Sequence, residues 1–320
     1  GLGWACSLPF PMWRDWRGLP DALGSLLEKS GARRVVATMT GEIADCFSCR
    51  EVGVAHIVES LSAVARDRVD GVGVYLVDGR IVEPAEALGT PLMAAASNWH
   101  ALARLAAVHA PAPRSLLVDV GSTTTDVVAL VAGAAAPLAL DDAGRMLTGE
   151  LVYTGIERTP LATLVRFLRH GGVGRPVAAE RFADSRDVWI LVGGLPEDAA
   201  RCDTADGGPA TRDAARIRIA RAMLVEPAEL TPEQAVVAAE RCAAVQARRV
   251  AAAIHRVVEG HGWEPSGVVL SGHGEALARR AIGLAMPRAR VVSLAGVIGS
   301  AASRAAPAHA LALVARGMLP

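Results

Sequence analysis

The stretch LLVDVGSTTTDVVAL, residues 116–130, decides the fold class. An apolar run of strand length, residues 115–120, carries Asp119 to a short turn, and a second apolar run, residues 126–131, follows at once. Gly121 allows a ligand to approach the backbone closely. Asp119 at the strand end is expected to hold Mg²⁺, which would bridge phosphate oxygens. This strand–turn–strand unit therefore predicts an α/β protein with a phosphate-binding turn.

The residues of the turn favour ligand binding over a purely structural role. A plain β-hairpin is the alternative, but its two-residue turn usually contains Asn-Gly or Asp-Gly. Hydroxyl residues follow the glycine here, namely Ser122, Thr123, Thr124 and Thr125. Their side chains and the neighbouring amides are suited to phosphate oxygens.

A second candidate turn lies in VVLSGHGEALARR, residues 268–280. A buried strand is expected to end at Gly272 and Gly274, and a helix to begin directly after them. Amides at such a helix start favour an anion or a nucleoside edge. His273 is either a ligand contact or a histidine whose ring is satisfied by backbone groups. This motif is weak alone and becomes informative together with the first turn.

The rest of the chain alternates between helical and strand patterns. A helix is expected over 19–27 and a strand over 34–39, and residues 72–77 and 80–82 read as a hairpin. Further helices are expected at 54–64, 91–108, 159–169, 210–223 and 232–259. The prolines of HAPAPR, residues 109–114, predict a joint between an N-terminal lobe (1–112) and a C-terminal lobe (113–320). The C-terminal lobe would carry a helical insertion at about 140–262.

Composition excludes several classes of protein. The 320 residues carry 33 basic and 33 acidic side chains, so no net charge favours nucleic acid or an anionic membrane. Charges interrupt every apolar run before it reaches the length of about 18 residues that a membrane span needs. Five scattered cysteines favour a reducing compartment over a disulfide framework. With no recognisable signal peptide, we expect a cytoplasmic protein that acts on small molecules.

Several strings together resemble the family of tetrahydromethanopterin-linked one-carbon-transfer pathway proteins. This family is similar to hydantoinase A and oxoprolinase, within the acetate and sugar kinase/Hsp70/actin superfamily. The strings are ATMTGEIADCF (37–47), DVGSTTTD (119–126), YTGIERTP (153–160) and TADGGPAT (204–211). The resemblance runs from about Leu8 to the C-terminus. It implies a two-lobed, ribonuclease H-like α/β fold with ligand phosphates at the turns between lobes.

The resemblance also implies a reaction. The family's characterised activity couples an aminomethylfuran diphosphate to a tyramine phenol and releases diphosphate, in the synthesis of methanofuran-type cofactors. Asp119 with Mg²⁺ and the amides of the turn would neutralise the leaving diphosphate. An ATP-dependent kinase or ATP-using hydrolase on the same fold is a competing interpretation. A non-catalytic module that binds a phosphate ligand is another.

Candidate substrate groups follow the strand expected at 34–39. Thr38, Thr40, Glu42 and Asp45 place hydroxyls and carboxylates at a strand end, where α/β proteins bind ligands. Glu42 or Asp45 would take the phenol proton or hold the substrate amine. The alternative is a solvated helix start with Thr40 as its cap and Glu42 in the first turn. Asn98, inside an apolar helix, either faces the ligand or satisfies backbone groups.

Two further charged residues have open roles. Arg158 either pairs with diphosphate through its planar guanidinium or forms a salt bridge with Glu157 or a neighbouring helix. Asp206 is either a second metal contact or, as we favour, the aspartate of an Asp-Gly turn.

The N-terminus departs from the family pattern. Family members usually begin with a strand and an Asp-x-Gly-Gly turn, the first phosphate turn, whereas this chain opens with GLGWACSLPFPMWR. We expect the first strand to be missing from a fragment, and the alternative is a protein that has lost part of its phosphate site.

Overall fold

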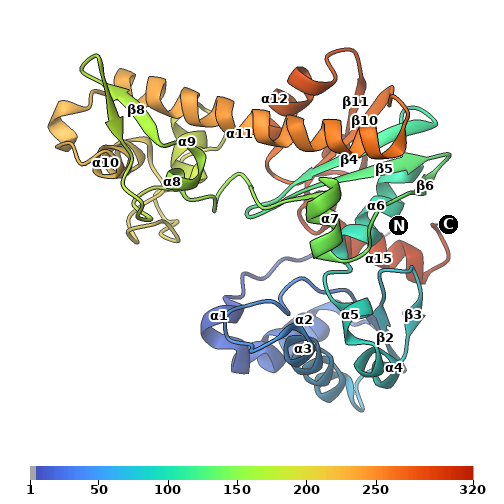
Figure 1. Ribbon diagram of the computed structural model, residues 1–320. Coiled ribbons are helices and arrows are strands. Elements are labelled where there is room, and N and C mark those ends of the chain that lie inside the picture. Colours follow the sequence, from blue (N-terminus) through green and yellow to red (C-terminus); the bar gives the residue numbers. More distant parts are fainter. Residues whose placement is uncertain (1–4, 320) are drawn as a thin grey trace. The chain divides into compact units, whose positions relative to one another are not determined.

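The chain forms two compact units in a computed structural model that describes residues 5–319 (Figure 1). Unit 1 comprises the described residues up to Leu117, Val128–Arg145, and those from Val292 onward, and unit 2 comprises Val118–Val127 and Met146–Val291. The boundary predicted near residue 112 falls shortly before the first change of unit. Part of the opening segment, residues 1–4, lies outside the described residues.

Unit 1 contains a three-stranded sheet in the order β1-β2-β3. Its strands are β1 (Arg34–Ala37), β2 (Gly71–Tyr75) and β3 (Ile81–Val82). β1 and β2 are parallel, whereas β2 and β3 are antiparallel. The predicted strand and hairpin are therefore confirmed.

The helices of unit 1 come before, between and after these strands in the chain, and three of them lie near its C-terminus. They are α1 (Met12–Asp15), the 3₁₀ helix η1 (Trp16–Gly18), α2 (Leu19–Ser30), α3 (Arg50–Ala65), α4 (Pro84–Gly89), α5 (Pro91–Ala94), α6 (Asn98–Val108), α13 (Leu294–Ile298), α14 (Ser300–Arg304) and α15 (Ala306–Ala315). α15 packs against α6 and β1.

The single helix predicted over 91–108 is wrong. The chain forms α5 and α6 with a break between them, where Ala96 adopts a left-handed conformation (φ 47°). Just before the break, the carbonyl of Met93 in α5 accepts a hydrogen bond from the amide of Val77 (2.8 Å) rather than from a following helical turn. Alanine favours helix strongly, so the sequence gives no sign of this break, which tertiary hydrogen bonding decides.

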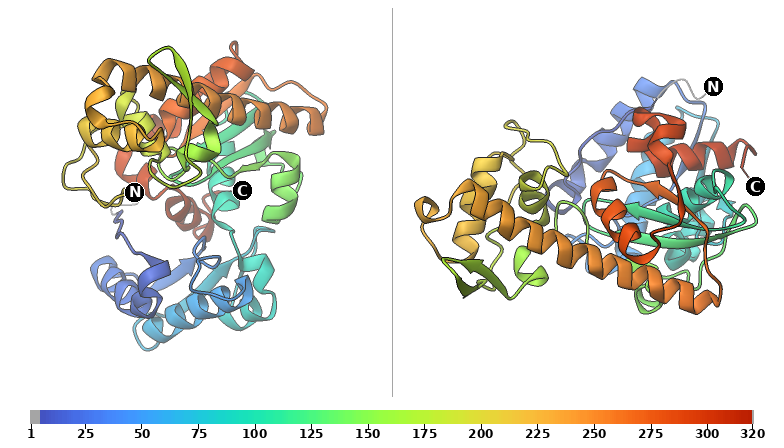
Figure 2. Two further views of the ribbon diagram at one scale, coloured as in Figure 1. Left: turned by 60° about the vertical axis from the view of Figure 1, so that its left-hand side comes forward. Right: turned by 90° about the horizontal axis from the view of Figure 1, so that it is seen from above.

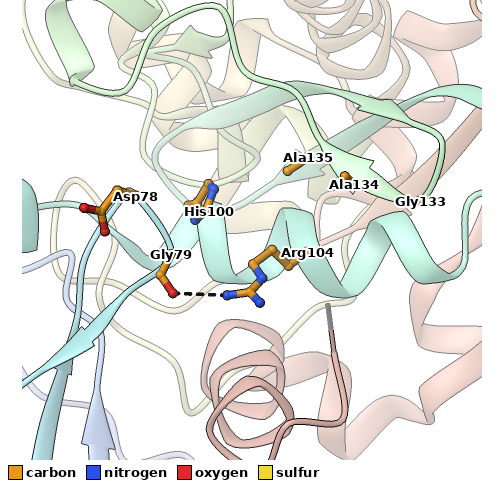
Figure 3. Close-up of a pocket in the computed structure, with 7 residues that line it drawn as sticks. All are labelled: Asp78, Gly79, His100, Arg104, Gly133, Ala134 and Ala135. Carbon is orange, nitrogen blue, oxygen red and sulfur yellow. Dashed lines mark hydrogen bonds between the residues drawn. The ribbon is translucent and has the colours of Figure 1, made fainter.

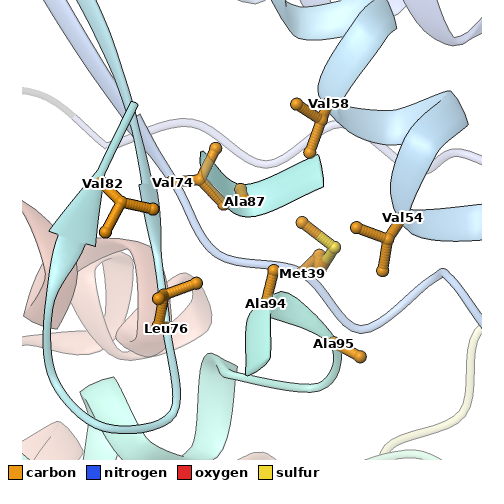
Figure 4. Close-up of a cluster of buried hydrophobic side chains, with 9 residues drawn as sticks. All are labelled: Met39, Val54, Val58, Val74, Leu76, Val82, Ala87, Ala94 and Ala95. Carbon is orange, nitrogen blue, oxygen red and sulfur yellow. The ribbon is translucent and has the colours of Figure 1, made fainter. Parts of the chain in front are cut away.

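A compact apolar cluster holds the elements of unit 1 together (Figure 4). Val54 and Val58 lie four residues apart on one face of α3, and Val74 and Leu76 lie on one side of the chain at β2. The remaining members are Met39, Val82, Ala87, Ala94 and Ala95. This cluster fixes the segment that follows β1.

A six-stranded sheet contains the first predicted phosphate turn. Its order is β11-β10-β4-β5-β6, with β7 pairing with β5. The strands are β4 (Arg114–Val120), β5 (Thr125–Val131), β6 (Ala134–Ala135), β7 (Leu151–Val152), β10 (Gly267–Ser271) and β11 (Arg290–Ser293). β4 and β5 are largely buried, which explains why they read as nearly continuous apolar runs.

Unit 2 is built around the 30-residue helix α11. Figure 2 shows α11 in orange, running along unit 2, where it packs against α12 and α9. Thr231 and Gln234 form a capping box at its start, and Gly262 ends it with a left-handed φ of 66°. The other helices are α7 (Asp142–Thr148), at the border of the units, α8 (Leu161–Leu164), α9 (Ser185–Leu191), α10 (Arg212–Ala222), η2 (Pro227–Glu229) and α12 (Glu275–Ala285).

The helix predicted over 159–169 is also wrong. The chain forms only the short α8 there, followed by the antiparallel hairpin of β8 (Phe167–His170) and β9 (Val173–Pro176). Gly171 and Gly172 make its turn, both with positive φ. A Gly-Gly pair between strands is a hairpin signal, and it overrides the helical spacing that precedes it.

Candidate functional site

The turn between β4 and β5 exposes unused backbone amides. Gly121 donates its amide hydrogen to the carbonyl of Thr124 (2.9 Å), which closes the turn. Within the described residues, the amides of Ser122, Thr123 and Thr124 donate to no protein acceptor. These three residues keep partial contact with solvent, whereas Thr125 is buried. Successive free amides in a tight turn form a concave site of positive potential that suits an anion.

The second predicted turn lies directly against the first. Gly274 donates its amide hydrogen to the carbonyl of Val120 (3.0 Å), at the end of β4. A Cβ at Gly272, whose φ is +81°, would collide with the same carbonyl and stand 2.9 Å from the carboxylate of Asp119. Both glycines are therefore required by close packing. Two motifs that are far apart in the sequence meet here.

A third segment, TGIER at residues 154–158, braces the outer side of the first turn. The amide of Ile156 donates to the carbonyl of Gly121 (3.0 Å). The amides of Glu157 and Arg158 both donate to the carbonyl of Ser122 (3.1 and 2.9 Å). The carbonyls of the turn are thus engaged from this side, which leaves its amide face for a ligand.

Buried side chains hold this third segment in place, and no local sequence pattern indicates them. The carbonyl of Gly155 accepts hydrogen bonds from Gln246 Nε2 (2.7 Å) and Ser185 Oγ (2.9 Å). Gln246 in turn accepts a hydrogen bond from Trp189 Nε1 (2.7 Å) and donates to Thr154 Oγ1 (2.9 Å). α9 and α11 therefore position the turn through a satisfied polar network in the core.

Asp119 lies at the junction of the two turns. Burial, together with the charge of Asp126, raises the pKa of Asp119 to about 7, although Ser271 and His273 act in the opposite direction. The residue keeps partial contact with solvent. Ser271 is buried, and its hydroxyl has no hydrogen-bond partner of ordinary length within the described residues. A cation or a donor from a ligand would satisfy both groups.

Glu157 is the centre of a charged network beside the turn. It accepts hydrogen bonds from Arg186 (2.9 Å) and from Arg201 (2.8 Å), and His273 Nε2 lies 3.5 Å from its Oε1. Burial acts to raise the pKa of Glu157, but His273 and the two arginines lower it to about 2. Half of the His273 side chain is exposed. A permanent carboxylate thus holds an accessible imidazole near the amide face.

Asp119 is the carboxylate of this site that could hold a magnesium ion shared with a ligand. No group of three or more His, Cys, Asp or Glu side chains among residues 5–319 is arranged to hold a metal by itself. Mg²⁺ does not need such a cage, because it commonly binds one or two carboxylates, waters and substrate phosphates. The repulsion between Asp119 and Asp126 would be relieved by a cation at Asp119.

The predicted substrate residues of unit 1 have different environments. Glu42 is 1% exposed and lies in a turn before α3, so the alternative of a solvated helix start is wrong. Thr38 shares a hydrogen bond with Ser97 (2.7 Å, Oγ1 to Oγ). Thr40 and Asp45 are exposed. Within the described residues, both carboxylate oxygens of Glu42 have no hydrogen-bond partner, which marks it as the unusual group of this set.

The structure also shows the environments of the other predicted polar residues. Asn98 is the first residue of α6, not an interior one, and is half-buried. Arg158 is exposed, and its backbone adjoins the first turn. Asp206 accepts a hydrogen bond from the amide of Gly208 (3.0 Å) and pairs with Arg218, as the turn interpretation predicts.

A comparison with protein families identifies the group to which this architecture belongs. The hydantoinase/oxoprolinase family model matches residues 33–315, which include both turns and their supporting segments. The chain belongs to the hydantoinase/oxoprolinase family. The predicted likeness to hydantoinase and oxoprolinase is therefore confirmed.

Two relatives of this chain have a named activity. One, from Methanocaldococcus jannaschii, is 29% identical over 217 residues, 68% of this chain and 64% of its own length. Another, from Methanococcus vannielii, is 29% identical over 167 residues, 52% of this chain and 74% of its own length. Both are named (4-{4-[2-(gamma-L-glutamylamino)ethyl]phenoxymethyl}furan-2-yl)methanamine synthase. The match thus spans less than two thirds of the first relative.

A solved structure shares the fold. The nucleotide-free structure of acetone carboxylase, from a study of ATP-dependent acetone carboxylation, matches with a TM-score of 0.50 and 12% identity. The match covers 94% of this chain and 49% of that one, so the chain spans about half the length of this neighbour. At this identity the likeness supports a mixed α/β fold of the same kind and no more.

None of the helices within residues 5–319 is both long enough and apolar enough to cross a bilayer.

Proposed function

We propose that this protein is a transferase that joins an aminomethylfuran diphosphate to the phenol oxygen of a tyramine derivative. We further place it in the two-lobed acetate and sugar kinase/Hsp70/actin superfamily. The names of the two relatives support the reaction, and the paired turns support the way its leaving group is bound. The observation that carries the proposal is the set of three free amides, Ser122 to Thr124, beside the carboxylate of Asp119.

The proposed reaction is a substitution at the furfuryl carbon. A bond forms from the phenol oxygen to that carbon while the bond from the carbon to a diphosphate oxygen breaks. Diphosphate leaves with the electron pair, and the phenol proton passes to a base. Charge grows on the diphosphate in the transition state, so donors aimed at its oxygens lower the barrier.

The residues of unit 2 would bind the leaving group. The amides of Ser122, Thr123 and Thr124 would donate to diphosphate oxygens, and His273, held by Glu157, would add a further donor. The exposed Arg158, whose amide donates to the carbonyl of Ser122 in the turn, would pair with an outer phosphate. Mg²⁺ on Asp119, when bound, would neutralise part of the charge that develops on the diphosphate.

In unit 1, Glu42 is the group whose environment best fits a role in the reaction. A buried carboxylate without a hydrogen-bond partner is costly unless a proton or a cation neutralises it. It would hold the ammonium group of the substrate or accept the phenol proton. The exposed Asp45 has no comparable environment, and Thr38 already shares its hydroxyl with Ser97.

The test is direct detection of the product. The protein is incubated with the furan diphosphate, a tyramine derivative and Mg²⁺, and mass spectrometry is used to detect the aryl ether while released diphosphate is measured. We expect Asp119→Asn to reduce the rate by about 100-fold or more. Asp70→Asn is a control, because the side chain of Asp70 forms an exposed ion pair with Arg33. Absence of the ether with every tyramine derivative would contradict the proposal.

An ATP-using hydrolase is the second candidate, and the family match favours it. It predicts steady phosphate release from ATP alone, lost in Asp119→Ala. If ATP is hydrolysed in this way and no ether forms, the hydrolase interpretation replaces the transferase one.

A further inference from the structure

The charged network at Glu157 contains an arginine that is partly exposed to solvent. Arg201 lies in the loop between α9 and α10, and 41% of its side chain is exposed, whereas Arg186 is 5% exposed. Arg201 donates to both carboxylate oxygens of Glu157, from Nη1 to Oε1 and from Nη2 to Oε2 (each 2.8 Å). Because the amide of Glu157 is bonded to the carbonyl of Ser122, this bidentate pair holds the guanidinium beside the first turn.

Arg201 and His273 lie next to the same oxygen atom. Arg201 Nη1 is 2.8 Å from Glu157 Oε1, and His273 Nε2 is 3.5 Å from that oxygen. Half of the His273 side chain is exposed, whereas Glu157 is 4% exposed. The turn that carries His273 is bonded to the end of β4 through the amide of Gly274 and the carbonyl of Val120. Two accessible nitrogen groups are therefore anchored on one buried carboxylate beside the predicted phosphate site.

One hydrogen of the Arg201 guanidinium is not used by the protein. A guanidinium has five N–H donors. Nε donates to Asp203 Oδ1 (2.8 Å), and Nη2 donates to Glu157 Oε2 (2.8 Å) and Asp203 Oδ2 (3.3 Å). Nη1 donates to Glu157 Oε1, and within residues 5–319 its second hydrogen has no acceptor. This hydrogen is available to a ligand at the exposed side of the network.

The loop that carries Arg201 is held by its own hydrogen bonds. The carbonyl of Arg201 accepts a hydrogen bond from the amide of Ala210 (3.0 Å), and the amide of Arg201 donates to the carbonyl of Asp198 (3.2 Å). Asp206, further along the loop, pairs with the fully buried Arg218 (3.0 Å). The backbone at Arg201 is thus already ordered, which lowers the entropy cost of binding a ligand through its side chain.

The charges of this network are balanced. Two guanidinium groups, of Arg186 and Arg201, pair with two carboxylates, of Glu157 and Asp203. The network therefore offers an anion a directed hydrogen bond rather than an excess of positive charge. The planar guanidinium of Arg201 supplies such a bond, whereas the ammonium group of a lysine would keep the charge without this geometry.

We propose that Arg201 binds the outer phosphate group of a bound diphosphate, beside His273, and so makes the site select a diphosphate over a single phosphate. The amides of residues 122–124 would hold the inner phosphate group, and Arg201 Nη1 would donate its remaining hydrogen to the outer one. The inference rests on the proposed function, because that function places a diphosphate at the turn. It adds a ligand-binding residue that no sequence motif indicates.

The experiment measures binding of diphosphate and of phosphate to the full chain by calorimetry with Mg²⁺. Arg201→Lys keeps the net charge, and we expect it to weaken diphosphate binding by about tenfold and to leave phosphate binding unchanged. Asp203→Asn removes a negative charge but also a carboxylate that orients Arg201. It should weaken diphosphate binding too, whereas an effect of net charge alone would strengthen it.

Arg104→Lys is the matched control. Arg104 donates to the carbonyl of Gly79 (3.3 Å) at a cavity of about 290 Å³ within unit 1 (Figure 3), whereas the residues of the predicted phosphate site belong to unit 2. The control should leave both affinities unchanged, and melting curves without ligand establish that each variant folds.

The outcomes separate this inference from the proposed function. Diphosphate affinity that is unchanged in Arg201→Lys, or an equal loss of phosphate and diphosphate binding, would overturn the inference and leave the proposed function standing. If Arg201→Lys does not fold, stronger diphosphate binding by Asp203→Asn would overturn it in the same way. Absence of diphosphate binding in the unaltered protein would contradict the diphosphate site of the proposed function, and the inference with it.

Discussion

Gly155 lies against the backbone of Ser122, so closely that a Cβ at position 155 would stand 2.5 Å from the carbonyl carbon and oxygen of Ser122 and from the amide nitrogen of Thr123. The atoms it would meet are main chain, which cannot rotate away. The amide face of the predicted phosphate turn therefore depends on the absence of a side chain at position 155, which is far from the turn in the sequence.

Gly155→Ala should displace the turn between β4 and β5. We expect a loss of stability of about 1–3 kcal/mol, because overpacking in a rigid region forces the backbone to shift. Diphosphate binding, measured by calorimetry with Mg²⁺, should fall by about tenfold or more. Gly283→Ala in α12 is the control, since a Cβ there meets nothing within 4 Å. It should leave binding unchanged, and equal behaviour of the two variants would refute the role of Gly155.

Much of this site could be predicted from the sequence. β4, the turn with Asp119, β5 and the turn around His273 each have a local signal, since strand periodicity and glycine placement depend on neighbouring residues. The support of the turn could not be predicted, because Gln246 contacts Thr154 across 92 positions in the chain. A contact of that span has no local signature. The break at Ala96 was missed for a related reason, since only its tertiary partners disfavour a helix there.

Gln246→Leu tests the buried network without a large change in volume. The substitution removes the partner of Trp189 Nε1 and a donor to the carbonyl of Gly155. We expect the free energy of unfolding to fall by about 2–4 kcal/mol, because several buried polar groups lose their partners. Val237→Ala on the same helix is exposed and should change it by less than about 0.5 kcal/mol. Urea unfolding of both variants provides the comparison, and similar midpoints would argue against the network.

Glu157 should make the protein sensitive to acid. Its pKa is lowered from an ordinary value of 4.5 to about 2, so its contribution is present above pH 4.5 and is lost as the pH falls toward 2. The shift corresponds to a contribution on the order of 3 kcal/mol for this buried carboxylate. Urea unfolding at pH 5.5 and pH 3 measures the loss. Glu157→Gln should be less stable at pH 5.5 but lose less between the two values. An equal loss in both proteins would show that other carboxylates cause the acid sensitivity.

Glu42→Gln should stabilise the protein, in contrast to Glu157→Gln. Burial raises the pKa of Glu42, so its neutral form favours folding, and that contribution is lost as the pH rises above the ordinary value of 4.5. At pH 8 the unaltered protein therefore either buries the charged carboxylate of Glu42 or keeps it protonated at a pH where a carboxyl group in water is ionised. Both states cost free energy. A glutamine of similar shape cannot ionise, and we expect it to raise the free energy of unfolding at pH 8 by about 1–2 kcal/mol and by less at pH 4.

The same variant separates two roles for Glu42 in the proposed reaction. If Glu42 holds the substrate ammonium, Glu42→Gln should raise KM for the aminomethylfuran diphosphate by about tenfold or more but leave KM for an analogue without the amine unchanged. If it accepts the phenol proton, kcat should fall instead and the acidic limb of the pH–rate profile should disappear. Glu51→Gln, an exposed change at the start of α3, is the control. If a catalytic role keeps Glu42 buried at an energetic cost, the Glu42→Gln protein should gain stability as it loses activity. A Glu42→Gln protein that is instead less stable at both pH values and fully active would show that this carboxylate is structural.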